Sequence, residues 1–274
     1  MRIDMFKSKP IDELAIDRIR TYAEFLPKFK DVFYLAYSGG KDSVVILDLM
    51  IRSGCPYEIH HNHTTVDNPE LVYFVREQAK KHKIIIHYPV DKDGKRISMF
   101  SLIKERGMLP RRNVRYCCEV LKEGGGEGYI VTTGVRWGES ARRSKRMMFE
   151  SCYKSKKKKY LHPIIDWSTA DVWQYIRERE LEYCELYDQG RDRLGCILCP
   201  MTNQTIVELD LAQYPKFVAA YKRAIMNPND PDKFRKLGVK LDVLKNKDEY
   251  WKWWLDHDAR KGKVDPNQQL LFDN

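Results

Sequence analysis

Apolar and amphipathic stretches alternate through the first half of the chain. Short apolar segments bounded by turn residues predict four β-strands, at Phe33–Tyr37, Glu58–His63, Ile84–Tyr88 and Tyr129–Thr133. Helical spacing between the strands predicts helices over 43–53 and 69–82, and residues 11–30 show the same spacing. Such alternation gives a parallel sheet with right-handed crossovers, so the expected fold class is α/β, a Rossmann-like parallel sheet with helices on both faces.

The pattern changes along the second half of the chain. Ser168 followed by Asp171 at the capping-box position predicts the start of another helix. After Pro200 the helical stretches are rich in charged and aromatic residues, which predicts a helical appendage. We therefore expect four regions: an N-terminal helical segment, 1–30; a catalytic domain, 31–200; the appendage, 201–262; and a flexible tail, 263–274.

The junction between the first strand and its helix carries the strongest chemical signal. Its residues are Ser38, Gly39, Gly40, Lys41, Asp42 and Ser43. Glycines accept positive φ, so their N–H groups can converge on an oxyanion, and the helix N-terminus adds partial positive charge. Lys41 and the two serine hydroxyls complete a cradle for pyrophosphate, and Asp42 is the loop residue best suited to help hold Mg²⁺. The junction therefore predicts a binding site for an adenine nucleotide such as ATP.

A Walker A loop and an ordinary turn are the alternatives to a pyrophosphate-binding loop at this junction. A Walker A loop requires glycine where Leu35 stands and Ser or Thr where Asp42 stands, so that motif is excluded. An ordinary strand-to-helix turn with a capping serine is the simpler alternative. The carboxyl end of the Tyr129–Thr133 strand, followed by Gly134 and Arg136, is expected at the same edge of the sheet.

Two pairs of cysteines form the second signal. Cys117 and Cys118 are adjacent, and Cys196 and Cys199 have Cys-x-x-Cys spacing. Adjacent thiolates suit the separate irons of a [4Fe–4S] cluster better than one tetrahedral ion, so we expect such a cluster first, zinc second and a redox disulfide third. Four unrelated buried thiols are the remaining alternative. Three further cysteines are interpreted as packing residues: Cys55, Cys152 and Cys184.

Several motifs in a fixed order resemble the phosphoadenosine phosphosulfate reductase family. They begin at Arg115-Tyr116-Cys117-Cys118, Thr133-Gly134-Val135-Arg136, His162-Pro163-Ile164 and Gly195-Cys196. The intact loop resembles the PP-loop of ATP pyrophosphatases. The resemblance implies the adenine nucleotide α-hydrolase-like fold and covers about residues 30–200. It places Gly134, Arg136, Ser140 and Arg143 near the nucleotide's phosphates or sulfate, with Lys41, Asp42 and Arg136 as catalytic residues.

The cysteines are similar to those of iron–sulfur adenylyl-sulfate reductases, which bind a [4Fe–4S] cluster there. Two features depart from those reductases: no cysteine follows Cys199 to act as the nucleophile on sulfur, and the Ser38–Ser43 loop is intact. Both are shared with the sulfur-transfer proteins of DNA phosphorothioation. The favoured hypothesis is an enzyme that adenylylates an acceptor and supports sulfur transfer. The alternatives are a sulfonucleotide reductase that makes sulfite, and a non-catalytic protein that binds nucleic acid or a partner.

Charge and targeting signals extend the list of expected partners. The net charge is +10, and basic runs at 142–146 and 154–159 suit nucleic acid, although a solvated loop explains them equally well. Residues 268–272 resemble the peptide that docks on the sliding clamp, and a cysteine desulfurase is a candidate sulfur donor. No segment reaches the ~18 apolar residues of a membrane span, and no signal peptide is recognised, so a cytoplasmic location is expected.

Overall fold

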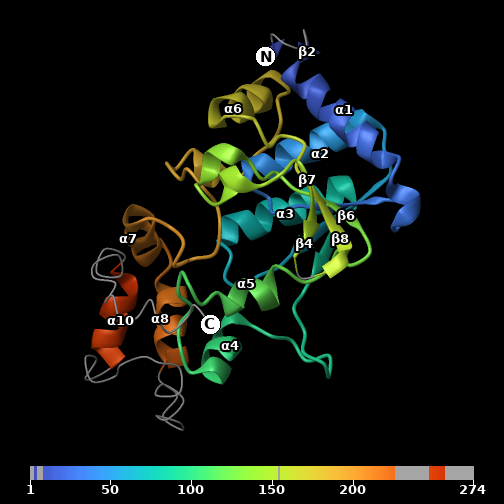
Figure 1. Ribbon diagram of the computed structural model, residues 1–274. Helices are drawn as coiled ribbons and strands as arrows, with labels where there is room; N and C mark the ends of the chain where they lie inside the picture. Colours follow the sequence, from blue (N-terminus) through green and yellow to red (C-terminus); the bar gives the residue numbers. More distant parts are fainter. Residues whose placement is uncertain (1–2, 5–8, 154, 226–246, 257–274) are drawn as a thin grey trace. The chain divides into compact units, whose positions relative to one another are not determined.

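The computed structural model describes residues 3–4, 9–153, 155–225 and 247–256 of the chain (Figure 1). Its contacts group the chain into two compact units. Unit 1 comprises 1–63, 69–87 and 124–194; unit 2 comprises 64–68, 88–123 and 195–274. The domain boundaries expected from the sequence stay a prediction, and the tail at 263–274 lies outside the described residues.

Unit 1 contains a six-stranded sheet with the order β5-β4-β3-β6-β8-β7. Its strands are β3 (Phe33–Ala36), β4 (Tyr57–Asn62), β5 (Ile85–His87), β6 (Ile130–Thr132), β7 (Phe149–Cys152) and β8 (Ser155–Leu161). Every neighbouring pair is parallel except β7 and β8. The chain runs from β3 toward β5 and from β6 toward β7, so the direction of winding reverses between β3 and β6. Ligands of such sheets bind beyond the carboxyl ends of the strands at this reversal.

Helices pack on the sheet of unit 1 in one hydrophobic core. They are α1 (Ile11–Ala23), α2 (Lys41–Ser53), α3 (Pro69–His82) and α6 (Thr169–Glu178). Short 3₁₀ turns lie at η1 (Leu26–Lys28), η2 (Trp137–Glu139), η3 (Arg143–Lys145) and η4 (Glu185–Tyr187). Phe33 and Leu35 of β3 are fully buried in this core, as their apolar side chains require. A short antiparallel pair, β1 (Ile3–Asp4) and β2 (Lys9–Pro10), precedes α1.

The α/β class and the Rossmann-like parallel sheet are therefore confirmed. The predicted strands coincide with β3 to β6 within a few residues, and α2 begins two residues earlier than expected. The capping box of α6 is also confirmed, because the Asp171 N–H donates to Ser168 Oγ at 3.1 Å and the Ser168 N–H donates to Asp171 Oδ2 at 2.7 Å.

The basic run at 154–159 lies largely in strand β8, which the sequence analysis did not predict. Successive side chains of a strand point to opposite faces. Lys158 is buried and its Nζ donates to the Gly125 carbonyl at 2.7 Å, while Lys157 is exposed. A wholly solvated loop is thus wrong for the described part of this run, and nucleic-acid binding by it stays a prediction.

Unit 2 is helical in its described part. Its helices are α4 (Met99–Arg106), α5 (Tyr116–Leu121), α7 (Gln204–Gln213), α8 (Pro215–Ile225) and α10 (Lys247–Leu255). The aromatic run of α10 enters the core: Trp254 Nε1 donates to the Pro110 carbonyl at 2.7 Å, and the Tyr250 hydroxyl accepts from the Leu109 N–H at 3.0 Å. Helices after residue 200 are as predicted, and these aromatic rings stabilise the fold from within.

No helix in the described part of the chain combines the length and the apolar content needed to cross a membrane.

Candidate nucleotide site and cysteine cluster

The loop between β3 and α2 is shaped by a glycine that no other residue can replace without strain. Gly39 has φ +77°, and a Cβ there would lie 2.7 Å from Leu71 Cδ1 and from Val75 Cγ2 of α3. Both the left-handed backbone and the lack of a side chain are therefore required. The loop turns closely over α3 and delivers Lys41 to the first position of α2.

A second glycine brings the end of β6 against the same helix. A Cβ on Gly134 would lie 2.7 Å from Asp42 Cβ and 2.9 Å from the Asp42 backbone carbon. The two segments that the sequence analysis expected at one edge of the sheet are thus in direct contact.

The serine hydroxyls of the loop are bonded within it. Ser43 Oγ donates to the Gly40 carbonyl at 2.8 Å, and Ser38 Oγ lies 3.2 Å from Ser43 Oγ. The Gly40 N–H donates to Ser38 Oγ at 3.3 Å. Hydroxyls and amides therefore gather at the start of α2, where the helix dipole favours an anion.

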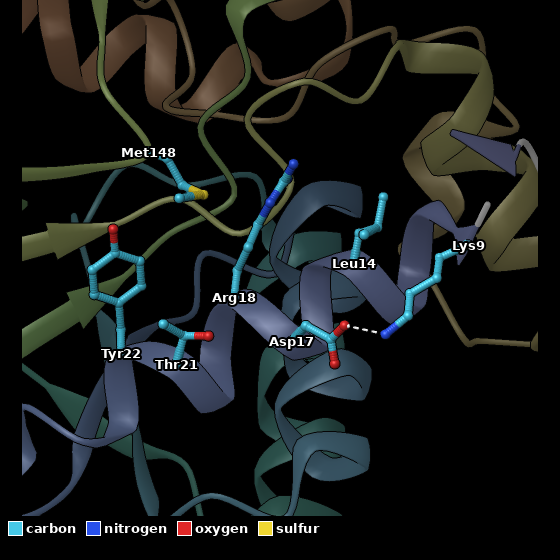
Figure 2. A pocket seen from close by; sticks show the side chains of 7 residues that line it. All are labelled: Lys9, Leu14, Asp17, Arg18, Thr21, Tyr22 and Met148. Carbon is cyan, nitrogen blue, oxygen red and sulfur yellow. Dashed lines mark hydrogen bonds and ion pairs between the residues drawn. The ribbon is translucent and has the colours of Figure 1, made fainter. Parts of the chain in front are cut away.

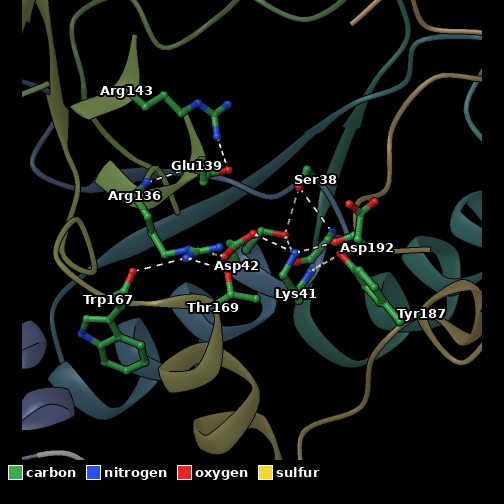
Figure 3. Close-up of polar contacts among 12 residues, drawn as sticks. Ser38, Lys41, Asp42, Arg136, Glu139, Arg143, Trp167, Thr169, Tyr187 and Asp192 are labelled. Carbon is green, nitrogen blue, oxygen red and sulfur yellow. Dashed lines mark hydrogen bonds and ion pairs between the residues drawn. The ribbon is translucent and has the colours of Figure 1, made fainter. Parts of the chain in front are cut away.

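Lys41 is buried, at 6% exposure, and both of its donors have oxygen partners (Figure 3). Its N–H donates to the Tyr187 hydroxyl at 2.9 Å, and its Nζ donates to the Asp192 carbonyl at 2.9 Å. Its Nζ also lies 3.8 Å from Asp42 Oδ2. The ammonium group of the motif is thus held close to the loop.

Asp42 is paired with Arg136. Arg136 Nε donates to Asp42 Oδ1 at 2.7 Å, and Arg136 Nη1 donates to the Trp167 carbonyl at 3.2 Å and to Thr169 Oγ1 at 3.3 Å (Figure 3). Arg136 is 2% exposed. The guanidinium therefore neutralises and orients the Asp42 carboxylate, and the predicted roles of both residues toward Mg²⁺ and phosphate stay predictions.

Ser140 and Arg143 follow Arg136 on η2 and η3. Glu139 connects them, because its carboxylate pairs with Arg143 and its Oε2 accepts the Arg136 N–H at 2.8 Å. Ser140 Oγ accepts the Arg143 N–H at 3.3 Å. The predicted phosphate-binding side chains thus lie on two consecutive short turns, and Arg136 at the start of the first turn bonds to Asp42 of the loop.

The sequence analysis missed the residues that hold this arrangement from other segments. They are Glu139, Trp167, Thr169, Tyr187 and Asp192. Tyr187 and Asp192 lie in the short segment before Gly195-Cys196, and the nearness of that motif was the only available signal.

A buried histidine lies at the carboxyl end of β8. His162 is fully buried, and its Nδ1 is 2.7 Å from Thr133 Oγ1. Burial, followed by the positive charge of Arg146, lowers the pKa of His162 to about 4, although Glu150 opposes this. The imidazole is neutral at physiological pH.

In unit 2, four cysteine side chains line one cavity of about 30 Å³, together with Lys122 and Tyr221. These are Cys117 and Cys118 of α5, and Cys196 and Cys199 of the loop before α7. The two sequence-predicted pairs are therefore brought together. Cys184 was predicted to be a packing residue, and it is 1% exposed in the core of unit 1.

The Cys196–Cys199 turn is held in a constrained conformation. Leu198 has φ +55°, a left-handed conformation that costs a non-glycine residue about 1–2 kcal/mol. The Leu198 N–H donates to Asp210 Oδ2 at 2.7 Å, and the Ile197 carbonyl accepts from the Tyr221 hydroxyl at 3.1 Å. Such over-determined strain is typical of functional turns.

The thiols influence one another's protonation. A hydrogen bond to Cys118, with burial second, raises the pKa of Cys117. The same bond lowers the pKa of Cys118 to about 6, and Lys122 and Arg115 favour its thiolate further, although burial opposes this. Burial raises the pKa of Cys196 to about 11 despite Lys122. One thiol of the adjacent pair is thus disposed to carry a negative charge.

The four cavity cysteines can be compared with the ligands that a metal ion and an iron–sulfur cluster require. Among the residues that the structure describes, no group of three or more His, Cys, Asp or Glu side chains is placed to hold a metal ion. Four thiols lining one cavity nevertheless supply the donor type of an iron–sulfur cluster, in which each iron takes a single thiolate. The four thiols are therefore the type of ligand that a [4Fe–4S] cluster takes. In the described part of the chain, they are not placed to bind one metal ion together.

A separate cavity of about 440 Å³ lies along α1 (Figure 2). Its charged side chains have partners: Lys9 Nζ pairs with Asp17 Oδ2 at 2.9 Å, and Arg18 binds Asp166 through two bonds of 2.7 Å. These charges are satisfied within the fold, so the cavity provides no argument for a second charged ligand.

Comparison with known proteins finds similarity to one domain family and to one of its solved structures. The protein-family model named phosphoadenosine phosphosulfate reductase domain matches residues 33–202 of this chain. An adenosine 5'-phosphosulfate reductase from Oceanobacillus iheyensis is 28% identical over 177 residues, covering 62% of this chain and 71% of that protein. The crystal structure of phosphoadenylyl-sulfate reductase from Candida auris, with phosphate, matches with a TM-score of 0.51 and 21% identity over 72% of this chain and 97% of that one. That structural match shows the fold.

Longer relatives also match. Two uncharacterized proteins of Methanocaldococcus jannaschii are 28% and 26% identical over 200 and 207 residues, covering 69% and 73% of this chain. The chain spans 40% and 49% of their respective lengths.

Proposed function

Because the chain belongs to the phosphoadenosine phosphosulfate reductase domain family, we propose that it is an enzyme that cleaves ATP between the α and β phosphates to support sulfur transfer. The observation that carries this proposal is the intact Ser38–Ser43 loop, whose amides, hydroxyls and buried lysine gather at the start of α2. Such a site stabilises the negative charge that a leaving pyrophosphate acquires.

The proposed step is adenylylation of an acceptor oxygen. That oxygen attacks the α-phosphorus, the bond from the α-phosphorus to the α–β bridging oxygen breaks, and pyrophosphate leaves with the electron pair. Lys41 and the loop amides bind the leaving group, and Asp42, oriented by Arg136 at 2.7 Å, contributes a carboxylate oxygen to the Mg²⁺ that accompanies ATP. Ser140 and Arg143 bind the α-phosphate. The outer sulfur of a persulfide, such as that carried by a cysteine desulfurase, then displaces AMP. A reducing thiol cleaves the resulting disulfide to the donor and leaves the sulfur on the acceptor.

A [4Fe–4S] cluster on Cys117, Cys118, Cys196 and Cys199 is the cofactor that we propose. The support is the shared cavity of these thiols, together with Lys122, whose pKa is raised chiefly by Cys196 and which favours thiolates. Zinc is the second choice, because it needs three or more donors converging on one point. When bound, the cluster supplies iron-held sulfide and electron-transfer chemistry.

Nucleic acid is the proposed acceptor. It is supported by the net charge of +10 and by the run at 142–146, in which Arg142 and Lys145 are exposed. The possible sliding-clamp peptide at 268–272 lies outside the described residues. The aromatic run of α10 does not support base stacking, since Tyr250, Trp251 and Trp254 are buried.

A sulfonucleotide reductase is the second candidate, favoured by the relatives named adenosine 5'-phosphosulfate reductase. Such a reaction requires a nucleophilic thiol. In a reductase of this kind, the thiol would come from Cys152, from Cys184 or from another protein.

Offering radiolabelled ATP and adenylyl sulfate separately distinguishes these functions. Pyrophosphate release from ATP, dependent on an oligonucleotide acceptor and without sulfite, supports the proposal. Sulfite production with thioredoxin overturns it in favour of the reductase. Oligonucleotide binding that survives Lys41→Ala, with neither reaction, indicates a non-catalytic binding protein.

A further inference from the structure

The two donors of Lys41 are bound by a segment that lies outside the loop motif. The Tyr187 hydroxyl accepts the Lys41 N–H at 2.9 Å, and the Asp192 carbonyl accepts from Lys41 Nζ at 2.9 Å. Tyr187 also has its ring centroid 5.3 Å from Lys41 Nζ, and its hydroxyl would lie 3.3 Å from a Cβ on Gly40. Residues 187–192 thus lie against the part of the loop that would bind phosphate (Figure 3).

The partner atoms have the chemistry of phosphate oxygens. The N–H at the first position of α2 is one of the donors that helix N-termini offer to anions. The neutral Tyr187 hydroxyl accepts from the Lys41 N–H, and the Asp192 carbonyl oxygen accepts from Lys41 Nζ. Neither acceptor carries a negative charge. Burial raises the pKa of Tyr187, which keeps its hydroxyl protonated and uncharged.

The Tyr187 ring is held independently of its hydroxyl. It contacts Trp173 edge-on, with centroids 5.1 Å apart, and Trp173 makes a similar contact with Tyr183 at 5.2 Å. Removing the hydroxyl alone therefore leaves these ring contacts in place. By contrast, Gly190 has φ +86° and open space around its Cβ position, and residues 188–190 are exposed, so this part of the 187–192 segment lies at the surface. The next residue, Arg191, is buried.

We infer that residues 187–192 form a strap that sets nucleotide affinity: a phosphate group binds by replacing the Tyr187 hydroxyl on the Lys41 N–H and the Asp192 carbonyl on the Lys41 ammonium. This rests on the nucleotide-binding part of the proposed function. Each bond to the strap must be exchanged for a bond to phosphate, so part of the binding free energy goes into releasing the strap. Tyr187 is a positioning residue in this scheme, and the loop motif does not reveal it.

The test compares Tyr187→Phe with Tyr129→Phe. The control also removes one tyrosine hydroxyl, but one that donates to Glu58 Oε2 at 3.1 Å near the amino ends of β6 and β4, outside the 187–192 segment. Titration calorimetry is done with Mg·ATP, inorganic pyrophosphate and adenylyl sulfate on each full-length protein. Because a net hydrogen bond no longer has to be broken, Tyr187→Phe is expected to bind pyrophosphate and the preferred nucleotide about three- to tenfold more tightly, with the control unchanged.

Other affinities overturn the inference. Equal binding by wild type and Tyr187→Phe means that the hydroxyl is not displaced, and weaker binding means that it stays and donates to the ligand. If adenylyl sulfate shows the expected gain while ATP does not bind, the strap stands and the ATP-cleaving function fails. If ATP binds all proteins alike, the strap fails and the function stands. Binding of none of the three ligands overturns both.

Hydrogen exchange supplies a readout that a structural defect would not reproduce. Backbone amides of residues 185–193 in the wild type should exchange faster when pyrophosphate is bound, because the strap is released. Thermal unfolding of Tyr187→Phe without ligand reports whether the fold is retained. Unchanged or slower exchange of this segment on binding contradicts the release.

Discussion

The loop at Ser38–Ser43 and the four-cysteine cluster represent two different ways of building a site. The loop depends on backbone shape: Gly39 and Gly134 allow close approach, and oxygen atoms accept hydrogen bonds from donors of the loop at 2.8–3.3 Å. The cluster depends on side-chain chemistry. A hydrogen bond between the Cys117 and Cys118 thiols raises the pKa of Cys117 and lowers the pKa of Cys118. A loop of the first kind is sensitive to an added carbon atom or a lost cation, whereas a cluster of the second kind is sensitive to each sulfur.

Removing the cation of the loop should have the largest effect. Lys41→Ala is expected to lower pyrophosphate release from ATP by about 10²–10³-fold, because one donor to developing charge is lost in a buried site. Iron content should not change. Lys80→Ala, which removes an exposed lysine paired with Glu77 on α3, is the matched control. Normal release by Lys41→Ala would exclude the proposed role of the loop.

Adding one carbon atom separates backbone shape from chemistry. Gly39→Ala is expected to lower the free energy of unfolding by about 3 kcal/mol, through left-handed strain and a Cβ 2.7 Å from Leu71 and Val75. Gly94→Ala has a similar φ of +79° but open space, so about 1–2 kcal/mol is expected. Chemical denaturation measures both. Equal losses would mean that contact with α3 does not constrain the loop.

Removing one sulfur tests the cluster. After anaerobic purification, Cys196→Ser is expected to lower iron from about four atoms per chain by at least about tenfold, since a [4Fe–4S] cluster takes a thiolate at each iron. Nucleotide binding should persist. Cys55→Ser, a change at a cysteine outside the cavity, should retain its iron. Zinc in place of iron in the wild type would favour the second choice of metal.

A smaller effect concerns pH. The pKa of buried His162 is about 4, below the ordinary value of 6.5, so the unfolded chain takes up this proton first as pH falls. The free energy of unfolding should therefore decrease between pH 6.5 and pH 4, by about 1 kcal/mol or more from this group. In urea titrations, the free energy of unfolding of His162→Gln should decrease less steeply with falling pH than that of wild type. Identical slopes for wild type and His162→Gln would refute this assignment.

The fold was predictable wherever local pattern and tertiary environment agree. The apolar run at Phe33–Tyr37 is a strand because both faces of a central parallel strand are covered, and the helices of unit 1 showed their apolar spacing. Strand β8 was missed because consecutive lysines do not resemble a strand. Its pairing with β6, at Val131 opposite Tyr160, provides the backbone bonds that override this local preference.

The candidate site was predictable in its motifs and not in its supports. Gly39, Lys41 and the cysteine pairs could be selected because their chemistry is visible in short spacings. Tyr187 stands 146 positions from Lys41, and an isolated tyrosine carries no local sign of its hydrogen-bond partner. Thr169 and Trp167 were missed as Arg136 partners for the same reason.

By itself the sequence determined the α/β class, and it singled out the Ser38–Ser43 loop and the four cysteines that line one cavity, because each follows from residue types at short spacing. Tertiary structure alone decided that Arg136 neutralises Asp42, that both donors of Lys41 are held by residues 187–192, and that the lysine run forms an inner strand. The physical reason is that these outcomes depend on desolvation and on hydrogen bonds between segments far apart in the chain. Such interactions exist only after the chain has folded.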